Sequence, residues 1–231
     1  KLRLWDIEEG QIIDSIDTEA STVAWSHDGK RLIINQINNG EGGLVILDDK
    51  LQILKELDTQ AIVDEIVWLS DGSRFISLVT GWQPLVIWDW HKADDDNIFI
   101  DTEDFVRYIA PHPEFPTIAI ILSSHIELWN YDELDKLAEV SPPFPTNIYA
   151  AEWSEDSQYL AVSSIDGLFM WQPSNSDTLV DYSQSSPPAY QLAWLPDNSA
   201  VFYSDFDGNV FKWSTSLECV VAFTSYNIIK D

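Results

Sequence analysis

A three-residue pattern recurs through the chain at a nearly constant spacing, and this repeat restricts the fold more than any other feature. Its middle position is tryptophan, or leucine in one copy, and successive copies are 42, 41, 41, 42 and 42 residues apart. The copies are Leu4-Trp5-Asp6, Ile46-Leu47-Asp48, Ile87-Trp88-Asp89, Leu128-Trp129-Asn130, Met170-Trp171-Gln172 and Lys212-Trp213-Ser214. A fixed period of this length predicts one supersecondary unit repeated along the chain.

Each period contains the signals of four short strands. An apolar residue lies three positions before each middle residue, and in most copies another lies directly before it. This alternation is typical of a half-buried strand. Further upstream, a strand end runs into a tight turn in which Asp, Gly, Asn and Pro favour the turn, and an apolar strand follows. These turns are Trp25-Ser26-His27-Asp28-Gly29, Trp68-Leu69-Ser70-Asp71-Gly72, Trp153-Ser154-Glu155-Asp156-Ser157 and Trp194-Leu195-Pro196-Asp197-Asn198, with Pro111-His112-Pro113-Glu114 in the corresponding place.

Leu2–Asp6, Leu85–Asp89 and Asp166-Gly167 ahead of Trp171 resemble the signatures of the WD-repeat (WD40) family, and the resemblance covers nearly the whole chain. It implies an all-β fold, a β-propeller of four-stranded antiparallel blades. The repeats are degenerate, because no Gly-His dipeptide occurs. Only Ser164, Asp166 and Trp171 keep three members of the family's Asp-His-Ser/Thr-Trp relay in one blade. We expect packing to hold the blades together, with weaker polar clamps.

The strand count predicts one propeller domain over residues 1–231. It consists of a half blade at 1–16 and complete blades at 20–58, 60–101, 103–140, 146–183 and 188–224. Five and a half blades do not close a ring neatly, so the intact ring has either six blades or, as we expect, the commoner seven. The remaining blades would come from a missing part of a longer chain, since this one begins at Lys1 without methionine, or from another subunit.

The chain is strongly acidic, with a formal net charge of −27. Such a surface repels phosphate backbones and anionic lipid headgroups, which disfavours direct binding to nucleic acid or membranes. Two interpretations of the acidity remain open: it keeps the protein soluble, or it selects a partner with a basic surface.

Cys219 is the only cysteine, so no internal disulfide can form. A reducing compartment is therefore expected, the cytoplasm or else the nucleus. No apolar run approaches the length of a membrane span, and no signal peptide opens the chain.

The sequence contains no convergent set of catalytic residues, and we expect no enzyme activity, cofactor or metal site. The four histidines, His27, His91, His112 and His125, lack metal-ligand spacing, and His27 and His112 are interpreted as exposed turn residues. No Gly-x-Ser-x-Gly elbow is present. The acidic run Asp94-Asp95-Asp96-Asn97 lacks the alternating ligands of a calcium loop.

In the geometry that the WD-repeat resemblance implies, one face carries the loops between strands two and three and the loops between blades. Trp82 and Phe206 are aromatic residues of these loops, and each either anchors a partner or folds back on its own blade. The acidic candidates on the same face are Asp101, Glu103, Asp104, Asp166, Asp205 and Asp207. The opposite face is acidic too, so charge does not select a face. Trp25, Trp68, Trp153 and Trp194 recur at one position and are expected in the core.

These observations predict a non-catalytic protein–protein interaction scaffold, part of a longer protein or a subunit of a multiprotein assembly. The alternative is a propeller that gates a hydrolase domain. This alternative rests on a second resemblance. The stretch from Trp25 to Lys30 is also similar to blades of TolB-like proteins and of prolyl-oligopeptidase-type hydrolases.

Overall fold

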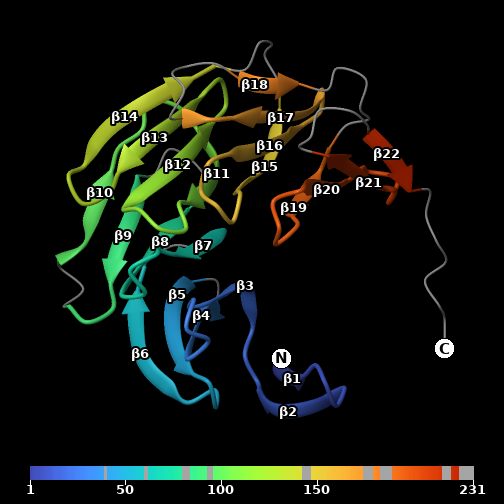
Figure 1. Cartoon of the computed structure of the whole chain (residues 1–231). Helices are drawn as coiled ribbons and strands as arrows, with labels where there is room; N and C mark the ends of the chain where they lie inside the picture. The colour runs from blue at the N-terminus through green and yellow to red at the C-terminus, as the bar shows by residue number, and fades with distance from the viewer. Residues whose placement is uncertain are drawn as a thin grey trace. The chain divides into compact units, whose positions relative to one another are not determined.

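The computed structural model describes residues 1–38, 41–59, 62–79, 84–92, 96–141, 147–173, 179–182, 189–214 and 220–223 (Figure 1). The chain divides into two compact units, Lys1–Glu103 and Asp104–Asp231, each of which is described by itself. Within the described residues, no helix is long and apolar enough to cross a bilayer.

The described strands form five four-stranded antiparallel sheets and one two-stranded sheet, and every sheet uses consecutive strands. The first unit holds the half blade, β1 (Leu2–Asp6) and β2 (Gln11–Ile16); blade 1, β3 (Ala20–Trp25), β4 (Arg31–Asn38), β5 (Glu41–Asp48) and β6 (Ile53–Asp58); and blade 2, β7 (Glu65–Trp68), β8 (Arg74–Leu78), β9 (Leu85–Asp89) and β10 (Ile98–Ile100).

The second unit holds the other three blades. They are blade 3, β11 (Val106–Pro111), β12 (Thr117–Leu122), β13 (Ile126–Asn130) and β14 (Asp135–Val140); blade 4, β15 (Ile148–Trp153), β16 (Leu160–Ser164), β17 (Gly167–Trp171) and β18 (Leu179–Tyr182); and blade 5, β19 (Gln191–Trp194), β20 (Ala200–Ser204), β21 (Val210–Ser214) and β22 (Val220–Phe223). The first strands of neighbouring blades lie next to one another, β11 against β15 and β15 against β19 (Figure 1). The fold predicted from the repeat, five complete blades and a half blade, is confirmed.

The core lies between successive blades. Every residue of β12 and β16, the second strands of blades 3 and 4, is buried. One apolar cluster joins Ile121 of blade 3 to Trp153 and Trp171 of blade 4, and another joins Met170 of blade 4 to Trp213 of blade 5. The middle residue of the repeated pattern is thus a packing residue in these blades.

Only one face of the half blade β1–β2 packs against blade 1. Leu2, Leu4 and Ile16 lie against the apolar cluster of blade 1. The other face leaves Trp5 51% exposed, so the first copy of the pattern is not a core residue.

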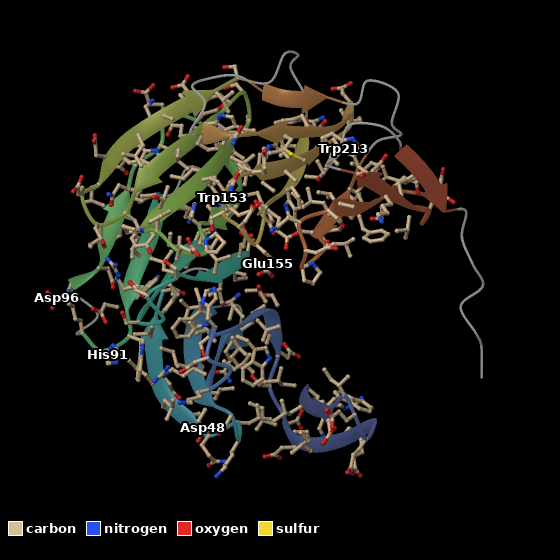
Figure 2. The ribbon with its side chains drawn as sticks, in the orientation of Figure 1. Asp48, His91, Asp96, Trp153, Glu155 and Trp213 are labelled. Carbon is tan, nitrogen blue, oxygen red and sulfur yellow. The ribbon has the colours of Figure 1, made fainter. Side chains whose placement is uncertain are left out.

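A tryptophan at the end of the first strand ties each of three blades to the blade before it. The indole Nε1 donates to a main-chain oxygen of the preceding blade's first strand: Trp68 to Ala24 at 3.2 Å, Trp153 to Ala110 at 3.0 Å and Trp194 to Glu152 at 2.9 Å. We call this contact the indole clamp. Of these tryptophans, Trp153 is labelled in Figure 2.

One expectation about tryptophan is wrong. Trp25 is 43% exposed, because only the two-stranded sheet β1–β2 precedes blade 1 in the described chain and it has no inner strand to cover the indole. The three residues that resemble members of the relay, Ser164, Asp166 and Trp171, do not form a hydrogen-bond chain to the indole. The buried Nε1 of Trp171 has no hydrogen-bond partner in the described part of the chain, while Ser164 Oγ donates to Gly167 O at 3.0 Å.

The predicted turn after the first strand repeats in atomic detail. In four blades the residue after the turn aspartate has a positive φ, and its N–H donates to the oxygen three residues back. These pairs are Gly29 with Ser26, Gly72 with Leu69, Ser157 with Ser154 and Asn198 with Leu195. The left-handed conformation explains why Gly, Asn or Ser and no bulky residue occupies this position.

Candidate partner-binding surface

Three aromatic rings gather on the second unit at the end of the blades where the second strand turns into the third. Phe206 lies 5.3 Å from Tyr149 and 5.0 Å from Tyr190, measured between ring centroids, and the two tyrosine rings are 5.6 Å apart. Phe206 is 60% exposed and Tyr190 43% exposed. We call Tyr149, Tyr190 and Phe206 the aromatic patch.

Backbone hydrogen bonds fix the loops that carry these rings. Tyr190 N donates to Ser204 O at 2.7 Å, which joins the start of β19 to the end of β20. Ala189 N donates to Ser164 O at 2.9 Å and links blade 5 to the β16–β17 turn of blade 4. The aromatic patch is therefore built before any partner arrives, which reduces the entropy lost on binding.

Carboxylates flank the aromatic patch in sequence and on the neighbouring turn. Asp205 shapes the β20–β21 turn, since its carboxylate accepts from Asn209 N at 2.8 Å and Asn209 Nδ2 at 2.8 Å. The hydrogen bond from Asn209 is the main reason why the pKa of Asp205 lies below its usual value. Asp207 and, on the β16–β17 turn, Asp166 are exposed. These side chains are suited to attract a cationic group.

The remaining predicted candidates do not join this surface as one set. Asp104, in the second unit, accepts from Ser124 Oγ at 3.2 Å and so lies beside the β12–β13 turn of blade 3. Asp101 and Glu103 are exposed in the first unit, in the segment that follows β10. Trp82 lies outside the described residues.

The sequence interpretation missed Tyr149 and Tyr190. Both lie four residues before the tryptophan of the indole clamp, Trp153 and Trp194. The corresponding residues in the first two blades are Ser21 and Asp64, so a comparison of the repeats at this position could have singled out the tyrosines.

Blade 3 contains the one group of residues in the described chain that could together ligate a metal ion, His125, Glu127 and Glu139. Lys136 Nζ already lies 3.1 Å from Glu127 Oε1 and 2.9 Å from Glu139 Oε2. These hydrogen bonds, that to Glu139 first, raise the pKa of Lys136 to about 12. The Lys136 ammonium group supplies the positive charge that a metal ion would bring to these two carboxylates. The arrangement is therefore an ion-pair network centred on the lysine.

The pKa of the buried Glu127 carboxyl reflects the same network. Burial by itself raises this pKa, and hydrogen bonds from Trp129, Lys136 and His125 more than compensate, so that it lies below its usual value. Trp129 Nε1 donates to Glu127 Oε2 at 2.7 Å, a polar clamp inside one blade.

The interpretation of His112 from the sequence as an exposed turn residue is wrong, because the histidine is buried. Its Nδ1 accepts the N–H groups of Glu114 and Phe115, both at 3.1 Å, and its ring lies 4.7 Å from that of Trp153. The imidazole thus closes the β11–β12 turn onto blade 4.

No protein-family model matches the sequence, and a search of curated proteins finds no significant match. The structure is matched by 1376 chains among solved structures. One of them is the crystal structure of the C-terminal WD40 domain of Sif2, with a TM-score of 0.71 over 89% of this chain and 18% sequence identity. This chain spans 58% of the length of that one.

The TM-score indicates a shared fold, and in the described part of this chain consecutive strands form the four-stranded antiparallel sheets expected of propeller blades. The chain has the fold of a WD40 β-propeller.

Proposed function

We propose that this protein is a non-catalytic interaction platform that holds a basic segment of a partner protein against the aromatic patch. The observation that carries the proposal is the ring cluster itself, in which Phe206 remains 60% exposed although it contacts two tyrosines. Exposed aromatic side chains on a rigid frame are typical of the residues that dominate binding energy at interfaces.

Charge supports the choice of a basic partner. Asp166, Asp205 and Asp207 lie on the two turns that meet at the aromatic patch, and the chain as a whole carries a formal charge of −27. Electrostatic attraction of this kind speeds association with a cationic segment and decreases with salt. A gate for a hydrolase domain is the other candidate, and no observation among the described residues favours it.

We also propose that the protein works in the cytoplasm. The single cysteine, Cys219, supports this, because a protein of an oxidising compartment commonly gains stability from disulfides.

The test is a selection of short random peptides displayed on phage against the immobilised protein, followed by affinity measurements on the selected peptides. We expect peptides rich in arginine and lysine. Phe206→Ala should weaken their binding by about tenfold, which is about 1.4 kcal/mol and typical of an interface anchor.

Phe99→Ala is the matched control, because Phe99 on β10 is 58% exposed and lies in the first unit. This variant should bind the peptides like the wild type. Selection of acidic or uncharged peptides, or equal binding by Phe206→Ala and wild type, would rule out the proposal.

A further inference from the structure

A second binding feature lies at the opposite end of the blades from the aromatic patch. It is a hollow of about 330 Å³ between blades 3 and 4, where the β11–β12 turn faces the β15–β16 turn. Its lining includes His112, Phe115 and Trp153, with Glu114 and Asp156 from the two turns. All of these residues belong to the second unit.

His112 organises the hollow as a neutral imidazole. Its Nδ1 accepts two main-chain N–H groups, so Nε2 carries the proton and donates to Ser157 O, 3.3 Å away on blade 4. The ring therefore joins the two turns without placing a positive charge in the hollow.

Two aromatic rings contact the His112 imidazole. Between ring centroids, the Phe115 ring of the β11–β12 turn lies 5.0 Å from the imidazole. The Trp153 ring, at the end of β15, lies 4.7 Å from it. Phe115 is 58% exposed, which leaves ring surface for a ligand. The indole N–H of Trp153 is already used in the clamp to Ala110, so Trp153 can offer a ligand only its ring.

The polar groups of the lining select a cation that has N–H donors. The charged side chains are Glu114 and Asp156, and no lysine or arginine is found among the described residues that line the hollow. Ser157 also lines it, and the buried Ser157 Oγ has no hydrogen-bond partner in the described part of the chain. A guanidinium group stacks on aromatic rings, pairs with carboxylates and presents five N–H donors, whereas a quaternary ammonium has none.

We propose that this hollow binds the side chain of an arginine residue from a peptide or protein. The guanidinium plane stacks on the Phe115 ring, and its N–H groups reach Glu114 and Asp156. This arginine pocket is independent of the aromatic patch, because the two lie at opposite ends of the blades.

The test compares two small probes of nearly equal shape. N-acetyl-arginine amide and N-acetyl-citrulline amide are titrated separately into the intact chain, and binding is followed by calorimetry and by the NMR signal of the Trp153 indole N–H. The arginine compound should bind and shift this signal. The citrulline compound, which lacks the charge, should leave it unchanged.

Variants locate the site. Phe115→Ala should weaken binding of the arginine compound roughly two- to fivefold, the value of a solvent-exposed cation–π contact. Glu114→Gln should also weaken it, and Phe99→Ala should not. Phe206→Ala should bind the compound like the wild type, which separates this proposal from that of the aromatic patch.

Three results would overturn the proposal. One is equal binding of the citrulline and arginine compounds. Another is tighter binding of N-acetyl-lysine amide, which would indicate an ammonium site. The third is a Phe115→Ala variant that folds and binds the arginine compound with wild-type affinity.

Discussion

His112 illustrates how one side chain can join two blades through its protonation state. Burial lowers the pKa of His112 from its ordinary value of 6.5, and the hydrogen bond to Ser157 and the charge of Glu114 only partly oppose this. Protonation at Nδ1 would also place an N–H against the main-chain N–H groups of Glu114 and Phe115. The neutral ring is therefore part of the folded structure.

This leads to a prediction about pH. Because the pKa is lower in the folded state, the stabilising contribution of His112 is complete above about pH 6.5 and is lost as the pH falls below that value. For one proton the loss is at most about 1.4 kcal/mol per pH unit. Urea unfolding of the wild type at about pH 7.5 and about pH 5.5 should show it.

His112→Asn is the comparison variant, since the Asn Oδ1 can still accept a turn N–H. The difference in unfolding free energy between wild type and variant should shrink as the pH falls, because other acidic groups titrate equally in both. A constant difference across this range would exclude the role given to His112.

At the scale of the element, the indole clamp makes the first strands of blades 2, 4 and 5 depend on the first strand of the preceding blade. Trp153 combines a buried ring with a donor to Ala110 O, whereas Trp5, on β1, is half exposed. Trp153→Phe keeps most of the packing and removes the donor, so that a main-chain oxygen inside the blade interface loses its partner.

We expect Trp153→Phe to lower the free energy of unfolding by about 1–3 kcal/mol. Chemical denaturation followed by circular dichroism is the measurement. Trp5→Phe is the control and should change stability by less than about 0.5 kcal/mol, as is usual for a surface position. Equal effects of the two substitutions would mean that the clamp hydrogen bond contributes nothing.

Strands and turns could be predicted because their signals are local. Apolar alternation marked the strand from Leu85 to Asp89, and the Asp71-Gly72 pair marked the turn with positive φ. The errors concern contacts with another blade. Whether Trp25 is covered, or whether His112 is buried, depends on residues about a repeat away, and periodicity carries no information about them.

The aromatic patch was found only in part for the same reason. Phe206 stood out as a loop aromatic, but its contact with Tyr149 exists because blades 4 and 5 lie side by side. Within a single repeat, Tyr149 and Tyr190 simply precede a strand or begin one. Neither shows the regular position in every copy that identified the packing residues.

At the scale of the whole molecule, the large negative net charge affects both stability and binding. Asp and Glu number 39 against 12 Lys and Arg, so the folded chain contains strong mutual repulsion. At 0.1 M ionic strength, dissolved salt largely screens the repulsion between exposed charges that lie more than about 10 Å apart.

Salt should therefore act in opposite directions on stability and on binding. Raising the sodium chloride concentration should increase the melting temperature of the free chain and weaken its affinity for the selected basic peptides. Calorimetric melting and peptide titration at low and high salt measure the two effects. Affinity that does not change with salt would leave solubility as the role of the acidic surface.

The indole clamp also bears on how such a chain can change over evolutionary time. Each acceptor is a main-chain oxygen, and the residues that supply it are as different as Ala24, Ala110 and Glu152. Any amino acid provides that atom, so these positions can take different side chains without loss of the joint between blades. A chain that shares only 18% of its residues with a WD40 domain can therefore have a fold that superposes on it with a TM-score of 0.71.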